Sequence, residues 1–163
     1  MIDVDVGLDI TPALVRFKRL AGRFTDFRPV LGGRVDVAAR RLIRRQFLSE
    51  GRAGVGGGGW PALQPTYLLR RVLPDRPMLR QSDGLFEALT KRGHPDQELV
   101  LERHRYALTI AEDADTRARF VGHQLGIPES NVPERQMIPD PVPKTFIDEV
   151  RGLVKSYVVT GKK

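Results

Sequence analysis

Apolar residues recur at spacings of three and four in two segments near the start of the chain, which is the spacing of one face of an α-helix. The first helix is expected to begin at Thr11-Pro12, because threonine is a favoured N-cap and proline a favoured first helical residue. Its apolar stripe consists of Leu14, Phe17, Ala21 and Phe24. The second helix is expected over residues 34–48, with Val35, Ala38, Ala39, Leu42, Ile43 and Phe47 on its buried face. Residues 25–33 are predicted to be a connection, since Pro29 and Gly32-Gly33 interrupt the pattern.

Alternation of apolar and polar residues predicts strands at residues 98–102 and 105–111, with a hairpin turn around Arg103-His104. In the second strand Tyr106, Leu108 and Ile110 share one face. Residues 117–121 are interpreted as a third strand. Short helices are expected at residues 66–72 and after Ser82 as N-cap, and a last helix over residues 144–155. Inward positions of the last two helices are Leu85, Phe86 and Leu89, and Phe146, Val150, Leu153 and Val154.

These elements predict an α+β fold, in which amphipathic helices pack on a small antiparallel sheet, with long loops and a C-terminal helix. The length of 163 residues favours a single domain, residues 1–163. Within it we expect an N-terminal arm at residues 1–10 and a C-terminal tail at residues 156–163. The glycine-rich stretch at residues 51–59 is expected to be a flexible loop, because glycine disfavours both helix and strand.

The chain carries 27 basic and 20 acidic residues, a net charge of +7 in which arginine dominates. Such a charge is compatible with nucleic acid, an anionic membrane surface or an acidic protein partner, and does not choose among them. The second helix and its exit have a basic face consisting of Arg40, Arg41, Arg44, Arg45 and Arg52. This face could bind phosphates, contact a neighbouring subunit or simply be solvated, and no aromatic residues are interleaved with it for base stacking.

Candidate chemistry is sparse. The absence of cysteine excludes disulfides, thiolate metal sites and a cysteine nucleophile. Residues 54–59 formally satisfy G-x-G-x-x-G, but a predicted helix precedes them and Trp60-Pro61 follows, which is the wrong context for a dinucleotide site. His94, His104 and His123 lack a second ligand at helical metal-site spacing. We therefore expect no enzymatic activity, no catalytic residues, no cofactor and no metal. Without a signal peptide or a membrane-length apolar stretch, a cytoplasmic protein with no membrane partner is expected.

Several landmarks occur in a characteristic order. Phe27-Arg28-Pro29-Val30-Leu31 precedes a long helix that ends in Gln46-Phe47. A glycine-bearing loop then leads into Gly59-Trp60-Pro61-Ala62-Leu63, and Leu79-Arg80-Gln81-Ser82-Asp83-Gly84-Leu85 follows. The series closes with His123-Gln124-x-Gly126 and Pro133-Glu134-Arg135-Gln136-Met137-Ile138-Pro139. In this order and spacing the chain resembles the phage virion morphogenesis family, the Mu-like tail-completion or neck proteins.

The resemblance implies a virion structural protein at the head–tail junction, or neck, of a tailed bacteriophage. Such a protein would complete or terminate the tail and join it to the head connector as a ring subunit. Implied partners are other copies of the chain (a hexamer, with a dodecamer as the alternative), head-closure or connector proteins, tail-tube or tail proteins, and packaged DNA through non-specific contact. The location would be the virion, and the host cytoplasm during assembly. The acidic amino end and basic carboxyl end suit head-to-tail contacts; the charges are Asp3, Asp5, Asp9, Lys155, Lys162 and Lys163. The alternative is a basic nucleic-acid-binding accessory protein.

The candidates for structural or interface roles are Trp60, Leu63, Gly84, His123, Gln124, Gly126 and Arg135. Trp60 is expected to pack against the second helix and fix the exit of the glycine-rich loop. His123 and Gln124 are expected to satisfy backbone groups where a strand ends, since both can donate and accept hydrogen bonds. Gly126 would permit a sharp exit at positive φ, and Arg135 would tie the returning segment to a carboxylate or to carbonyls.

Overall fold

The structure is a computed structural model that describes residues 11–52, 58–62, 78–80, 83–112, 114, 116–130 and 132–162. In chain order its elements are α1 (Thr11–Thr25), α2 (Arg28–Val30), a π-helical turn (Leu31–Val35), α3 (Asp36–Leu48), α5 (Gly84–Thr90), β1 (Gln97–Leu101), β2 (Tyr106–Ile110), α6 (Arg117–Leu125), a 3-10 turn (Pro128–Ser130) and α7 (Lys144–Thr160). The predicted α+β class is confirmed, with helices around a small antiparallel sheet.

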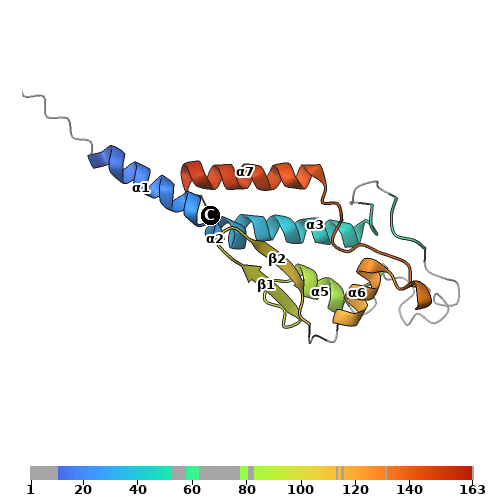
Figure 1. Cartoon of the computed structure of the whole chain (residues 1–163). Helices are drawn as coiled ribbons and strands as arrows, with labels where there is room; N and C mark the ends of the chain where they lie inside the picture. The colour runs from blue at the N-terminus through green and yellow to red at the C-terminus, as the bar shows by residue number, and fades with distance from the viewer. Residues whose placement is uncertain are drawn as a thin grey trace, which may run out of the picture.

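Helix α3 occupies the middle of the molecule. In Figure 1 it lies between α7 on one side and the β1–β2 hairpin, α5 and α6 on the other. The larger core cluster joins Ile43 and Phe47 of α3 to side chains from α5, β2, α6 and the segment before α7; these are Leu85, Ala88, Leu89, Ile110, Phe120 and Met137. A second cluster packs Val30, Leu31 and Val35 against Tyr157 of α7. The apolar face predicted for the second helix therefore supplies both clusters.

Helical structure resumes earlier than the sequence indicated. The prediction that residues 25–33 are a connection holds only for Asp26 and Phe27, because Thr25 ends α1 and residues 28–35 are helical. Pro29 lies in the first turn of α2, where its missing N–H costs no helical hydrogen bond. Gly32 lies in the π-helical turn, where an added Cβ would come within 2.8 Å of Leu101 Cδ2. The glycine thus allows the hairpin to approach the helix closely instead of ending the helix.

The two predicted hairpin strands are confirmed to within one residue at each end. They pair antiparallel, with Leu99 opposite Leu108, and the connecting turn contains Arg103 and His104. The backbone N–H of Phe27 donates to the carbonyl of Arg103 at 2.8 Å, which ties this turn to the start of α2.

Two predictions about elements after the hairpin are wrong. Residues 117–121 belong to helix α6, because Arg117, Phe120 and Gln124 lie at helical spacing and all point toward the body of the molecule. Arg117 donates a hydrogen bond to Ile110 O, Phe120 is buried, and Gln124 donates one to Ile138 O. The tail expected at residues 156–163 is helical as far as Thr160. Tyr157 explains the extension, since it is buried and its hydroxyl donates to Asp26 O at 3.2 Å.

Some predictions fall on residues that the structure does not describe. These are the arm at residues 1–10, most of the glycine-rich loop (residues 53–57), Leu63, the short helix at residues 66–72, Lys163, and Ser82 as an N-cap. Asp83 is the N-cap residue of α5; its backbone is left-handed and its carboxylate accepts a hydrogen bond from Arg80 Nε at 2.7 Å.

Candidate interaction surface

Helix α1 projects from the body of the molecule, so that its amino-terminal half extends beyond the end of α7 (Figure 1). The predicted apolar stripe is present along it, but none of the described residues covers most of the stripe. Leu14, Phe17 and Phe24 remain 50%, 68% and 59% exposed. Large apolar side chains gathered on one exposed face are characteristic of a surface that binds another molecule.

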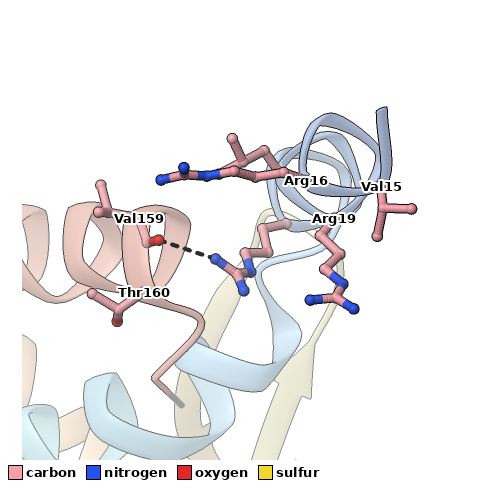
Figure 2. A pocket seen from close by; sticks show the side chains of 7 residues that line it. Val15, Arg16, Arg19, Val159 and Thr160 are labelled. Carbon is pink, nitrogen blue, oxygen red and sulfur yellow. Dashed lines mark hydrogen bonds between the residues drawn. The ribbon is translucent and has the colours of Figure 1, made fainter. Parts of the chain in front are cut away.

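A groove runs between α1 and α7, and we call it the α1–α7 groove. One part has a volume of about 480 Å³ and is lined by Val15, Arg16, Arg19, Leu20, Arg23, Val159 and Thr160 (Figure 2). An adjoining part of about 430 Å³ is lined by Phe24, Phe27, Val150, Arg151, Val154, Lys155, Val158 and Val159. Val159 borders both parts. The lining is thus aliphatic and aromatic, with cationic side chains among it.

Arg23 joins the two helices that form this groove. Its guanidinium donates to the carbonyls of Val158 at 3.1 Å and of Val159 at 3.2 Å, and Figure 2 draws the second of these bonds. Both carbonyls lie in the last turn of α7, where helix carbonyls lack intrahelical partners and a cation is favoured. In the same view Arg16 extends from α1 toward the end of α7. Arg16 and Arg19 are exposed, so they are available to a bound partner.

Trp60 packs where the sequence predicted. Its ring lies edge-on to Phe47 of α3, with 5.6 Å between ring centroids, and its indole N–H donates to Gln136 O at 3.1 Å. Its backbone N–H donates to Glu50 O, which brings the two ends of the glycine-rich loop together. The tryptophan therefore anchors the carboxyl end of the loop on α3.

Gln124 and Arg135 hold the returning segment, residues 134–138, against the body. The Gln124 amide accepts hydrogen bonds from the backbone N–H groups of Met137 and Ile138 and donates to Ile138 O, at 2.9, 3.1 and 2.8 Å. Arg135 is buried, and its guanidinium donates to Pro61 O and Ala62 O at 3.2–3.4 Å. The side-chain roles expected for these two residues are confirmed, although Gln124 acts from a helix and not from the end of a strand.

His123 and Gly126 lie beside this segment. The expected role of the His123 imidazole in satisfying backbone groups is not observed: its Nδ1 is buried without a hydrogen-bond partner among the described residues, and it is the carbonyl of His123 that accepts from Arg135 N–H. Burial, and to a smaller extent the positive charge of Arg135, lower the pKa of the imidazole. Gly126 has the expected positive φ of 75°. Gly84 is the first residue of α5 and takes no part in this cluster.

The basic face observed in the structure is smaller than the one predicted from the sequence. Arg40 is buried and does not belong to it, because Asp36 one turn earlier turns inward and binds the guanidinium at 2.9 Å. Arg41 is exposed but faces Glu149 of α7 at 3.4 Å. Arg44, Arg45 and Arg52 are exposed.

Asp36 is the centre of a buried polar cluster that was not predicted from the sequence. Besides Arg40, its carboxylate accepts a hydrogen bond from the Tyr106 hydroxyl at 2.7 Å and lies 3.8 Å from Arg92 Nε. Gln97 completes the cluster by accepting from Arg40 at 2.8 Å. Burial and then the hydrogen bond to Asp36 raise the pKa of Tyr106. The spacing of Asp36 and Arg40, four residues apart on an otherwise apolar face, is the signal that could have identified the cluster.

No family model, curated protein or solved structure matches the chain. In the described part of the chain, no three His, Cys, Asp or Glu side chains are grouped so as to hold a metal ion. None of its described helices combines the length and the apolar character needed to cross a membrane.

Proposed function

We propose that this chain is a structural subunit of a tailed bacteriophage virion. It acts at the head–tail junction, as one member of a ring that completes or terminates the tail and joins it to the head connector. The order of sequence landmarks shared with the virion morphogenesis family supports the phage context. The observation that carries the proposal of self-assembly is the uncovered apolar face of α1, formed by Leu14, Phe17 and Phe24.

Burial of this face against a neighbour would release apolar surface from water, a gain of about 25 cal/mol for each Å² covered. Leu14 and Phe17 of this face lie outside the set of residues that line the α1–α7 groove, whereas Phe24 belongs to both. A subunit with two different contact surfaces can associate head to tail, and head-to-tail contacts close into a ring when the rotation between subunits permits.

The alternative function, a nucleic-acid-binding accessory protein, is supported by the exposed arginines on α3 and α1. It is weakened by the engagement of Arg40 and Arg41 with Asp36 and Glu149, since paired guanidinium groups are less available to phosphates. The two functions differ in their dependence on salt, because binding to phosphates releases counterions and falls steeply as salt concentration rises.

The test is a measurement of assembly on the purified full-length chain. Sedimentation and electron microscopy are expected to show closed rings of one size, and immunogold labelling of purified virions is expected to mark the neck. Binding to duplex DNA is expected to be lost between low and physiological salt. A chain that stays monomeric at all concentrations, or virions without label, would contradict the proposal. Tight, sequence-selective binding of duplex DNA at physiological salt would establish the alternative.

A further inference from the structure

The first ten residues of the chain have a regular pattern that the proposed function does not use. Aliphatic side chains take the even positions, and aspartate or glycine takes the odd ones from residue 3 onward; the sequence is Met1-Ile2-Asp3-Val4-Asp5-Val6-Gly7-Leu8-Asp9-Ile10. In an extended chain, alternate side chains point to opposite sides. An extended segment with this sequence would have one aliphatic side and one side with three carboxylates, with no basic side chain to oppose them.

The α1–α7 groove has the complementary character. Its apolar wall includes Phe24, Val154 and Val158, and cationic side chains including Arg16 and Arg19 stand along it. None of the described residues that line it is acidic. A segment with one aliphatic and one acidic side could therefore place its aliphatic side chains on the apolar wall and its carboxylates beside the guanidinium groups.

The arm has the length and the position to reach this groove in another molecule. Helix α1 has 15 residues and is therefore about 22 Å long, whereas ten extended residues span about 33 Å. Residue 10 immediately precedes α1 in the sequence, and the amino-terminal half of α1 projects from the body (Figure 1). An arm of this length can follow the whole of α1 in a neighbour.

We propose that the α1–α7 groove is the docking site for the N-terminal arm, residues 1–10, of a second copy of this chain. The inference rests on the proposed ring assembly and names the segment that makes the contact between subunits. Any segment that docks in this groove has to satisfy its exposed cationic side chains, Arg16 and Arg19. The arm supplies the opposite charge.

The experiment uses charge reversal in the full-length chain. One variant reverses the arm (Asp3→Lys with Asp5→Lys), and a second reverses the groove (Arg16→Glu with Arg19→Glu). Each variant alone is expected to self-associate about tenfold more weakly than the wild type in sedimentation equilibrium, because arm and groove then carry like charges. An equimolar mixture of the two variants is expected to regain association. The basic arm of the first variant fits the acidic groove of the second, and the acidic arm of the second fits the basic groove of the first.

The matched control is Arg44→Glu with Arg45→Glu, which makes the same charge change on an exposed part of α3 and is expected to keep wild-type association. Circular dichroism of every variant checks the fold. Failure of the mixture to regain association would overturn docking of the arm in a second copy. Wild-type association of both reversed variants would overturn the groove as the site while leaving ring assembly intact. A monomeric wild-type chain would overturn ring assembly and this inference together.

Discussion

At the scale of single residues, a few polar side chains form hydrogen bonds with backbone groups that a neighbouring strand would pair with in a larger sheet. Gln124 binds three backbone groups of Met137 and Ile138, so this segment is satisfied without a partner strand. Arg135 does the same for the carbonyls that follow Trp60. Because a buried backbone group without a partner costs free energy, these side chains determine where the segment before α7 can lie.

Replacement of Gln124 by alanine is expected to lower the free energy of unfolding by about 2 kcal/mol, because it leaves partly buried backbone groups of Met137 and Ile138 unpaired. Urea denaturation measures the change. The control is Leu125→Ala at the next position, which is 72% exposed and expected to change the stability by less than about 0.5 kcal/mol. Equal stability of the two variants would show that Gln124 does not hold the segment.

The lowered pKa of His123 predicts that the stability of the fold depends on pH. Burial lowers the pKa of its imidazole, so in the pH range just below the ordinary histidine pKa of about 6.5 the unfolded chain takes up a proton that the folded chain does not. The contribution of His123 to stability is therefore complete above that range and is lost as the pH falls through it. We expect His123→Gln to reduce the loss of stability between about pH 7 and pH 5.

Thermal or urea unfolding of the wild type and His123→Gln at a series of pH values measures this effect. His104→Gln is the control, since His104 is an exposed histidine in the hairpin turn, and its pH profile is expected to stay close to that of the wild type. Parallel profiles for wild type and His123→Gln would contradict the prediction.

At the scale of elements, two glycines illustrate how the same residue type serves opposite purposes. Gly126 ends α6 with φ 75° and ψ 161°, a backbone conformation that is essentially restricted to glycine. An added Cβ would lie 3.1 Å from Glu134 N. Gly152 lies inside helix α7, with nothing within 4 Å of an added Cβ. The first glycine permits the turn, and the second weakens a helix.

Alanine is therefore expected to have opposite effects at the two positions. Gly126→Ala is expected to destabilise the fold by about 2 kcal/mol through backbone strain. Gly152→Ala is expected to stabilise it by about 0.5–1 kcal/mol, because alanine has the higher helix propensity. Chemical denaturation of both variants is the measurement. Destabilisation by Gly152→Ala would mean that α7 is covered there by something outside the described residues, and unchanged stability of Gly126→Ala would contradict the strain.

At the scale of the whole molecule, the two core clusters account for the packing of α3, the hairpin and α7, but they leave much of α1 outside. Arg23 attaches α1 to the end of α7, while Leu14 and Phe17 stay in contact with solvent. The apolar stripe of α1 therefore contributes little to the stability of the single chain. Its contribution is expected in assembly.

Phe17→Ser separates these two contributions. The unfolding free energy of the chain at concentrations where it is monomeric is expected to change by less than about 0.5 kcal/mol, because the side chain is already exposed. Self-association is expected to weaken about tenfold in sedimentation equilibrium, because apolar surface is lost from the contact. Leu48→Ser on the exposed side of α3 is the control and is expected to associate as the wild type does. Unchanged association of Phe17→Ser would exclude this face from the contact.

The sequence alone determined the elements that depend on near neighbours. The hairpin strands were predicted to within one residue, because alternation over a few residues and a short turn specify an antiparallel pair locally. The start of α1, its apolar stripe and the α+β class follow from patterns of the same kind. The position of Trp60 on α3 was also predicted, since a large indole at the end of a glycine-rich loop has to pack on the nearest apolar face.

The tertiary structure alone decided what covers each face. Whether residues 117–121 formed a strand or a helix depended on contacts of Phe120 and Gln124 with residues distant in the sequence, and the extension of α7 depended on Tyr157 reaching Asp26. Likewise, Arg40 is buried and does not belong to the basic face, because its guanidinium binds Asp36 and Gln97 in a cluster that also holds Tyr106. Local periodicity determines which side chains share a face, but burial of that face depends on segments that the chain brings together only when it folds.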